Sequence, residues 1–407
     1  MKIYKDYIDK LLDGIKIEWK TLGEVAKTYG GLSGKNKDDF KNGNAKYISY
    51  KNIFNNIKIN FDSLEAVKIS ASEKQNEVKY GDVLFTASSE TVDEVGISSS
   101  VTTKFDEKVY LNSFSFGVRF NDNIQIIPEF SKYLFRSHFM RAQITKTASG
   151  VTRFNISKSR FNKIKIPIPP LSVQAEIVCI LDAFTELTTE LTTELTARKK
   201  QYSYYRDLLL NFDNGEIEWK TLGEVAQYSK IRINCDQLDK TNYVGVDNLL
   251  QNRAGKKESN YVPIEGNLTG YCNNDILIGN IRPYLKKIWQ ADRAGGTNGD
   301  VLVVHPINGA INPRYLYHVL ADEKFFDYNM QHAKGAKMPR GNKSKIMEYH
   351  FPVPKNLDVQ ERIALTLDKF DTLTNSITEG LPREIELRQQ QYEYYRDMLL
   401  DFPQDIA

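Results

Sequence analysis

The chain has 407 residues, 41% hydrophobic and 26% charged, which is a globular composition long enough for two or three domains. No apolar stretch approaches the roughly 20 residues that span a bilayer, and residues 1–14 lack the apolar core of a signal peptide. Three widely separated cysteines argue against a disulfide framework and against a paired-cysteine metal site, so we expect a cytoplasmic protein. The net charge of +3 is too small to establish nucleic-acid binding, so local charge must be examined.

Several segments occur twice, which identifies the chain as an internal duplication. Ile17–Ala26 recurs unchanged as Ile217–Ala226. The other matched pairs are "YYRDLLL" (204–210) with "YYRDMLL" (394–400), "VQAEIVCILDAF" (173–184) with "VQERIALTLDKF" (359–370), and "PIP" (167–169) with "PVP" (352–354). Residues 1–16 resemble the end of the repeated helical segment, so we expect a stub of it there. The arrangement is consistent with two units related by a pseudo-twofold axis.

The first diverged half, expected over residues 17–166, mixes strand and helix patterns. "GDVLFTAS" and "FSFGVRF" predict strands, and "PEFSKYLFRSHFMRAQI" predicts a helix that starts at Pro128. Near its end, Lys146–Lys165 carries lysine and arginine but no acidic residue. Its Asn, Ser and Gly residues can also donate hydrogen bonds to phosphates and base edges. This segment is a candidate nucleic-acid contact, although a single run of charge is more often a solvated surface.

The central segment, expected as a shared helix within residues 167–212, has apolar residues at coiled-coil spacing. The positions that we expect in the helical interface are Ile177, Leu181, Phe184, Leu191, Leu195 and Tyr202. Within it, Thr185–Thr196 repeats the tetrapeptide "TELT" three times. One such unit lengthens a helix by ~6 Å and rotates its face by only about 40°. We interpret the repeat as a rod of adjustable length; the alternative is a local duplication that faces solvent and adjusts nothing.

The second diverged half, expected over residues 213–352, repeats the same order of elements. "DILIGNI" and "DVLVVHP" predict strands, and "PRYLYHVLADEKFFDYNM" predicts a helix. Lys334–Lys345 is a second acid-free basic segment, at the place in this half that corresponds to the first, and it includes Lys337. The segment Gly279–Trp289 interleaves cations with Asn280, Arg282 and Tyr284. Two basic segments at matching positions suit a two-part site on duplex DNA.

The distal segment, residues 353–407, repeats the shared helix. Its expected interface positions are Ile363, Leu367, Phe370 and Tyr395. Gly380 and Pro382 should kink or interrupt this helix, which would resume near Pro382 and run to Phe402. Two long amphipathic helices in one chain need a partner surface, and we expect them to pack against each other in antiparallel fashion. The predicted fold class is α+β: two α+β domains separated by two long antiparallel coiled-coil helices, related by a pseudo-twofold duplication.

No arrangement of residues predicts catalysis. The five histidines are scattered, and the glycine-lysine pair in Gly30–Asn36 lacks the spacing of a phosphate-binding loop. "NPRY" at Asn312–Tyr315 is better explained as the start of a helix than as a methyltransferase motif. We therefore expect a recognition subunit that is not an enzyme and binds neither metal nor cofactor itself.

These residues resemble the specificity (S) subunit of Type I restriction-modification systems over essentially the whole chain. The resemblance rests on "WKTLGEVA" at the start of each half, on "GDVLF", on "GVTRFNISKSRFNKIKIPIPPLSVQAEI" at the end of the first half, and on "RGNKSKIMEYHFPVP" at the end of the second. It implies that each diverged half is a target recognition domain for one half of a split, asymmetric DNA site. It also implies that the tetrapeptide repeats set the spacing between the half-sites.

The resemblance further implies partners and site residues. Two modification (methyltransferase) subunits would dock on the shared helices and carry S-adenosylmethionine, and two restriction subunits that use ATP and Mg²⁺ would join them. The DNA-binding role falls on matching positions in the basic segments: Arg153, Asn155, Lys158 and Arg160, then Arg340, Asn342, Lys343 and Lys345. Asn280 and Arg282 are added from their chemistry, and Lys337 from its basic segment. The alternative is a duplicated coiled-coil adaptor that binds two protein partners without DNA.

Overall fold

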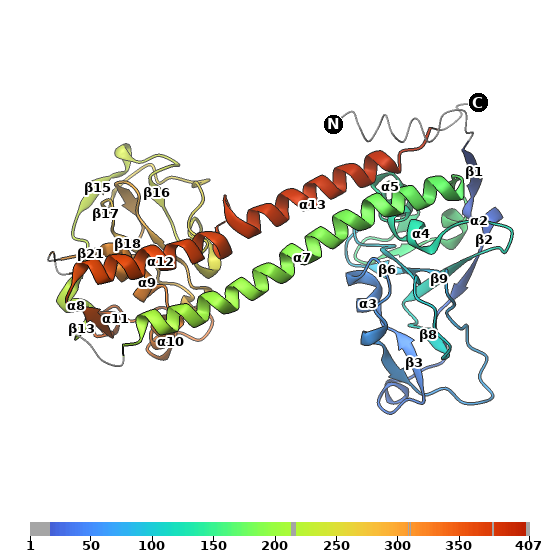
Figure 1. Cartoon of the computed structure of the whole chain (residues 1–407), viewed down its shortest axis with the longest axis horizontal. Coiled ribbons are helices and arrows are strands. Elements are labelled where there is room, and N and C mark those ends of the chain that lie inside the picture. Colours follow the sequence, from blue (N-terminus) through green and yellow to red (C-terminus); the bar gives the residue numbers. More distant parts are fainter. Residues whose placement is uncertain (1–16, 213–216, 308, 310, 377, 404–407) are drawn as a thin grey trace. The chain divides into compact units, whose positions relative to one another are not determined.

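The computed structural model describes residues 17–212, 217–307, 309, 311–376 and 378–403 (Figure 1). The expected stub over residues 1–16 lies outside the described residues. By its contacts the chain divides into two compact units: the first extends to Thr188 and also includes the chain from Arg388, and the second is Thr189–Leu387. No helix in the described part of the chain is long and apolar enough to cross a membrane.

The first unit is built from short strands and short helices, joined to parts of two long helices. Its strands are β1 (Glu18–Thr21), β2 (Ala26–Gly30), β3 (Ala45–Ile48), β4 (Glu65–Val67), β5 (Val83–Thr86), β6 (Ser88–Ser89), β7 (Ser98–Ser100), β8 (Val109–Leu111), β9 (Ser115–Phe120), β10 (Ala148–Ser149), β11 (Phe154–Ile156) and β12 (Lys165–Ile168). Its helices are α2 (Leu22–Val25), α3 (Tyr50–Asn55), α4 (Pro128–Leu134), α5 (His138–Lys146) and α6 (Lys158–Phe161), followed by the first part of α7 (Leu171–Leu210).

The second unit repeats this plan. Its strands are β13 (Ile217–Thr221), β14 (Ala226–Tyr228), β15 (Arg232–Asn234), β16 (Tyr243–Val244), β17 (Asn267–Tyr271), β18 (Ile276–Gly279), β19 (Ile288–Gln290), β20 (Gly295–Thr297), β21 (Val301–Pro306) and β22 (His350–Pro354). Its helices are α8 (Leu222–Val225), α9 (Pro313–Leu320), α10 (Glu323–Gln331), α11 (Lys343–Met347) and α12 (Leu357–Asn375), with the start of α13 (Gly380–Leu399).

One sheet is common to both units and another is not. The four-stranded sheet β2-β9-β5-β7 of the first unit has the same strand order as β14-β21-β18-β19 of the second. A further sheet differs between the units. It is three-stranded in the first unit, β4-β3-β8, and four-stranded in the second, β15-β17-β20-β16. The predicted α+β class and the internal duplication are confirmed, and the divergence of the halves has a structural counterpart in the second sheet.

The repeated sequence segments form the same antiparallel strand pair in each unit. Strand β1 pairs with β12, with Trp19 opposite Pro167, and β13 pairs with β22, with Trp219 opposite Pro352. The next residues form a short helix whose first turn is closed by a capping box, in which Glu24 accepts from the backbone N–H of Thr21 at 2.7 Å. Hydrogen bonds from the side chain and backbone of Thr21 lower the pKa of Glu24.

A buried glutamine in each shared helix forms hydrogen bonds with backbone groups of the unit. Gln174 accepts a hydrogen bond from the backbone N–H of Ile127 at 2.8 Å and donates to the carbonyl oxygens of Gln125 and Pro169. Gln360 accepts from the backbone N–H of Asn312 at 2.7 Å and donates to the Pro354 carbonyl at 2.7 Å. Both glutamines are fully buried, so these bonds replace water around backbone groups that would otherwise be unsatisfied.

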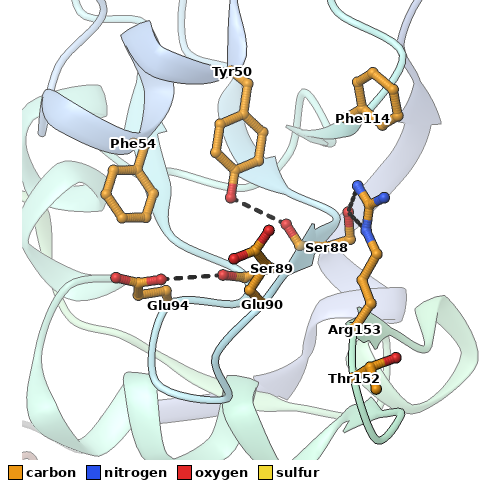
Figure 2. Close-up of a pocket in the computed structure, with 9 residues that line it drawn as sticks. All are labelled: Tyr50, Phe54, Ser88, Ser89, Glu90, Glu94, Phe114, Thr152 and Arg153. Carbon is orange, nitrogen blue, oxygen red and sulfur yellow. Dashed lines mark hydrogen bonds between the residues drawn. The ribbon is translucent and has the colours of Figure 1, made fainter. Parts of the chain in front are cut away.

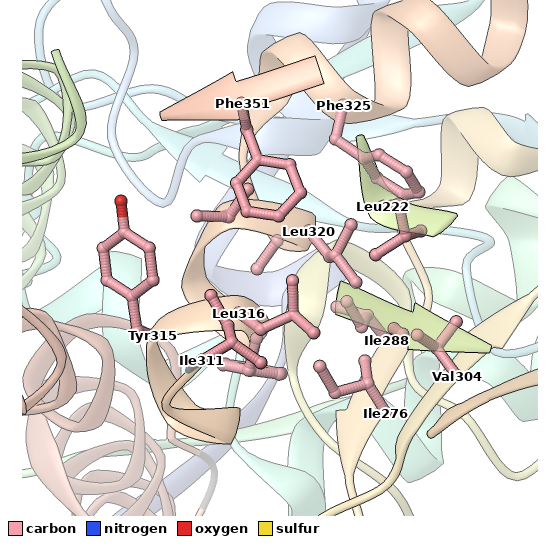
Figure 3. Close-up of a cluster of buried hydrophobic side chains, with 14 of the residues drawn as sticks. Leu222, Ile276, Ile288, Val304, Ile311, Tyr315, Leu316, Leu320, Phe325 and Phe351 are labelled. Carbon is pink, nitrogen blue, oxygen red and sulfur yellow. The ribbon is translucent and has the colours of Figure 1, made fainter. Parts of the chain in front are cut away.

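The long helices complete the core of each unit. In the first unit, Ile177 and Leu181 of α7 join a cluster that also holds Leu399 and Phe402 from the end of the chain. In the second unit, Tyr202 of α7 stacks on Phe370 of α12 at 5.8 Å. The start of α7 thus packs near the end of α13 and the end of α7 packs on α12, which is the predicted antiparallel pairing. Figure 3 shows the core of the second unit, where Leu316 and Leu320 of α9 meet Ile276 and Val304 of the common sheet.

Two predicted helices are each divided in two, contrary to expectation. The helix expected from Pro128 is α4 followed by α5, because Ser137 adopts an extended backbone and its hydroxyl caps the N–H of Met140. The helix expected from Pro313 is likewise α9 followed by α10, with Asp322 as the new cap. The apolar spacing continues across both breaks, so it gave no indication of these two caps.

The distal helix is interrupted as predicted. Helix α12 ends at Asn375, and α13 begins at Gly380 and ends at Leu399, short of the expected Phe402. Gly380 has φ +76°, and a Cβ at this position would lie 2.4 Å from the carbonyl oxygen of Thr372. Only glycine fits this turn, which explains why the second copy of the shared helix is not continuous.

Candidate nucleic-acid interface

The two basic segments fold into the same structure, a tight hairpin followed by a short helix. In the first unit, β10 and β11 pair antiparallel, with Ser149 opposite Asn155. In the second unit, Lys334 and Arg340 exchange backbone hydrogen bonds of 2.8 and 2.9 Å. Helices α6 and α11 follow directly. The two basic segments, which correspond in sequence, therefore also form the same structural elements.

A glycine at the start of each hairpin loop explains how the turn closes. Gly150 has φ +142° and Gly335 has φ +100°. A Cβ at Gly150 would lie 1.9 Å from the Arg153 carbonyl oxygen, and one at Gly335 would lie 3.1 Å from the Met338 carbonyl oxygen. Both loops need glycine for the same geometric reason.

Each hairpin rests on the segment that follows a central strand of the common sheet. In the first unit, Asn155 lies opposite Ser88 of β6. In the second, Arg340 lies opposite Ile281, and the N–H of Gly341 donates to the Asn280 carbonyl at 3.1 Å. The register therefore equates Arg340 with Asn155.

In the first unit, the four candidate side chains are exposed and none pairs with a carboxylate among the described residues. Arg153 donates to the Ser88 hydroxyl at 3.0 Å and lies over the Phe114 ring at 5.7 Å. Lys158 begins α6, with its ammonium 5.8 Å from the Phe116 ring, and Arg160 donates to the Ala148 carbonyl at 3.3 Å. The Asn155 amide donates to the Arg153 carbonyl at 3.4 Å. These groups keep donors available to an anionic ligand.

In the second unit, the candidates differ in how they are engaged. Lys337 and Lys343 are exposed and have no ion-pair partner among the described residues. Arg340 bonds Asp300 at 3.1 Å while 60% of its side chain stays exposed, and Lys345 bonds Glu348 at 2.6 Å. Asn342 caps α11 by accepting from the N–H of Ser344 at 3.1 Å, so its carbonyl oxygen is occupied.

Asn280 is buried and Arg282 is half-buried, and both contact the second hairpin through their backbone. Asn280 is 7% exposed, and within the described chain its Oδ1 and the Nε of Arg282 are buried without a partner. The backbone N–H of Arg282 donates to the Pro339 carbonyl at 2.7 Å. A Cβ added at Gly341 would lie 2.8 Å from Asn280 Oδ1 and 2.4 Å from Asn329 Oδ1. The expectation that Asn280 contacts DNA does not agree with its burial.

The expected helical-interface residues lie within the chain's own packing. Ile177, Leu181, Tyr202, Ile363, Leu367 and Tyr395 are buried, whereas Phe184, Phe370, Leu191 and Leu195 are half-buried. The Phe184 ring stacks on that of Tyr395 at 5.2 Å. In the tetrapeptide repeat, hydroxyls such as that of Thr193 donate to the carbonyl four residues earlier at 2.9 Å. The more exposed residues of this helix include Tyr204 and Leu208, which are not among the expected interface positions.

A cavity of about 570 Å³ lies beside the first hairpin and was not anticipated from the sequence (Figure 2). Its lining brings together residues from α3, β6 and the hairpin tip: Tyr50, Phe54, Ser88, Ser89, Glu90, Glu94, Phe114, Thr152 and Arg153. No pattern in the sequence indicated that Phe114, which is 57% exposed, would line a cavity with the Ser88–Glu90 segment.

The described residues contain no group of three or more His, Cys, Asp and Glu side chains able to hold a metal ion. The three cysteines are free: Cys179 is exposed, Cys235 is buried and Cys272 is intermediate. The features that remain are two hairpins with cationic side chains, held on matching sheets.

Comparisons with known proteins agree with this geometry. The family "Type I restriction modification DNA specificity domain" matches residues 15–199 and 214–387. The chain is 33% identical over 426 residues to the Type I restriction enzyme EcoR124I/EcoR124II specificity subunit of Escherichia coli, covering 98% of this chain and 97% of that protein. It is 31% identical over 426 residues to a putative type I restriction enzyme specificity subunit of Haemophilus influenzae, covering 99% and 100%.

Solved structures are similar in fold. The S subunit of a Type I restriction-modification system from M. genitalium superposes with a TM-score of 0.55 at 15% identity, covering 96% of this chain and 98% of that one. A chain from a structural study of complex assembly and conformational transition in a type I restriction-modification system gives a TM-score of 0.61 at 15% identity, with coverage of 95% and 98%.

Proposed function

Because the chain belongs to the family of Type I restriction-modification DNA specificity subunits, we propose that its two hairpin-and-helix elements each contact one half of a split DNA site. The chain recognises DNA and leaves catalysis to other subunits. The observation that carries the proposal is the matched pair of hairpins, which present exposed cations at equivalent places. Exposed lysine and arginine bind phosphates, and arginine and asparagine recognise base edges.

The contacts that we assign are exposed side chains of the two basic segments, together with the half-exposed Lys345. They are Arg153, Asn155, Lys158 and Arg160 in the first unit, and Lys337, Arg340, Lys343 and Lys345 in the second. Asn342, Arg282 and Asn280 would act by holding the second hairpin in place. Since Arg340 replaces Asn155 in the register, the two hairpins offer different donors, and the half-sites should differ in sequence.

The shared helices are proposed to dock two methyltransferase subunits. Tyr204 and Leu208 on α7 are 65% and 56% exposed, and Tyr394, the counterpart of Tyr204 in the repeated "YYRD" word, is 53% exposed. Exposed aromatic and leucine side chains on a helix are typical of protein interfaces. Their occurrence at duplicated positions suits two copies of one partner. Those partners would bring S-adenosylmethionine, and restriction subunits would bring ATP and Mg²⁺.

Methylation mapping tests the proposal. Cells with the chain should carry adenine methylation at a split, asymmetric site, and cells without it should lose that pattern. An adaptor that binds two proteins would leave the methylation unchanged. The purified assembly should also bind duplex DNA at low salt and release it at high salt, because phosphate contacts release counterions.

A further inference from the structure

The cavity beside the first hairpin has an unusual combination of groups. Figure 2 shows Phe54 and Glu94 on one side, Phe114 and Arg153 on the other, and the Ser88–Glu90 segment between them. The Tyr50 hydroxyl donates to the Ser88 carbonyl at 3.1 Å, and the Tyr50 ring stacks on Phe54 at 6.0 Å. The wall behind the segment is therefore aromatic, and the hairpin tip forms the opposite edge.

The two carboxylates of this cavity are not neutralised by a cation in the described chain. Glu94 accepts from the hydroxyls of Thr91 at 2.8 Å and Ser89 at 3.3 Å. Glu90 is exposed and has no hydrogen-bond or ion-pair partner among the described residues. The nearby guanidinium of Arg153 instead bonds the Ser88 hydroxyl and lies over Phe114. The Glu90 carboxylate is thus an available hydrogen-bond acceptor in the same cavity lining as Arg153, which is assigned to DNA contact.

A carboxylate beside bound DNA is repelled by phosphates, so it is favourable only where it meets hydrogen-bond donors. In the major groove the donors are the amino groups of cytosine N4 and adenine N6, and Glu accepts from cytosine N4 in known complexes. We propose that Glu90 recognises an exocyclic amino group in the half-site bound by the first unit. This inference rests on the function proposed above.

The second unit has no carboxylate at this place. Ser89 pairs with Phe154, and the corresponding backbone bond runs from Arg282 to Pro339, so Arg282 takes the place of Ser89 and Pro283 that of Glu90. A position that accepts hydrogen bonds in one unit is thus replaced by arginine and proline in the other. The amino-group preference should therefore be confined to one half-site.

Base analogues that lack only the amino group test the assignment in the complex assembled with its methyltransferase subunits. In the first half-site, each adenine is replaced by purine and each cytosine by 2-pyrimidinone, one at a time. The wild-type complex should lose about 5- to 100-fold in affinity at one position. The analogue that causes the loss identifies the base. With Glu90→Ala, which removes the acceptor oxygens, this loss should shrink several-fold or disappear, while Glu107→Ala, at an exposed carboxylate of the same unit outside the cavity, should keep it.

Two results would overturn the assignment while leaving the proposed function intact. One is that Glu90→Ala keeps the wild-type discrimination at every position. The other is that Glu90→Ala binds all sequences uniformly more tightly, which would mean that the carboxylate only repels phosphates. Absence of sequence-specific binding by the wild-type complex would instead refute the proposed function itself.

Discussion

Tyr133 and His318 occupy the same position on α4 and α9, and each hydrogen-bonds an aspartate of the shared helix that covers it. The Tyr133 hydroxyl donates to Asp182, and His318 Nε2 lies 2.6 Å from Asp368 Oδ1. Arg314 also bonds Asp368 at 2.6 Å. The two units thus use the same polar contact between domain and helix, but only the second uses a histidine, the residue type whose free side chain titrates near neutral pH.

This difference predicts that the second unit is the acid-sensitive one. Burial lowers the pKa of His318, whose Nδ1 has no partner in the described chain. Below about pH 6.5 the unfolded state therefore binds a proton that the folded state resists, so stability falls as pH falls, by at most about 1.4 kcal/mol per pH unit. Urea unfolding at a series of pH values should show this slope. His318→Gln should flatten it, and an unchanged slope would contradict the assignment.

The hairpin arginines should control DNA affinity. Arg340→Ala and Arg153→Ala should each weaken binding of the assembled complex, by about 1–3 kcal/mol where a base contact is lost. Where the lost contact is a phosphate, the salt dependence should become shallower by about one counterion. Arg293→Ala, which removes an exposed arginine paired with Asp292, is the matched control. Wild-type affinity in both hairpin variants would argue strongly against these contacts.

The second hairpin should be intolerant of any side chain at Gly341. A methyl group there would meet the buried amides of Asn280 and Asn329 at under 3 Å. We expect Gly341→Ala to lower the free energy of unfolding by about 1–3 kcal/mol, as overpacking does, and to weaken DNA binding. Gly299→Ala is a control, because a Cβ at Gly299 meets no atom within 4 Å. Equal stability of the two variants, measured by denaturant unfolding, would show that the hairpin can shift freely.

The tetrapeptide repeat should set the spacing of the half-sites. Deleting Thr189–Thr192 removes ~6 Å of helix, which corresponds to roughly one or two base pairs at ~3.4 Å per step. Methylation mapping should therefore detect a spacer shortened by that amount. Replacing the same four residues with alanine keeps the length and should leave the spacer unchanged. A deletion variant with the original spacer would refute the idea of a helical ruler.

Repeats in the sequence predicted the duplication and the shared helices, strand and helix patterns predicted the α+β class, and Gly380 and Pro382 predicted the interruption of the distal helix. The local register of the hairpins was not predictable, because it depends on hydrogen bonds such as that between Gly341 and Asn280. The exposure of site residues was not predictable either. Asn280 is a residue type that suits DNA contact, but its side chain is buried. Residue type and charge located the candidate segments, whereas exposure and pairing decided which of their side chains are available.

The glutamine contacts and the strand pairs at the base of each unit have an evolutionary consequence. The hydrogen bonds of Gln174 and Gln360 described above go to main-chain groups, and the paired strands in each unit carry the repeated segments of the sequence. Neither the glutamine hydrogen bonds nor the strand pairs depend on the side chains that distinguish one diverged half from the other. Recombination between related genes at these repeated segments would therefore join a different recognition half to the same helices, and the DNA target would change while the surfaces of the helices stayed the same.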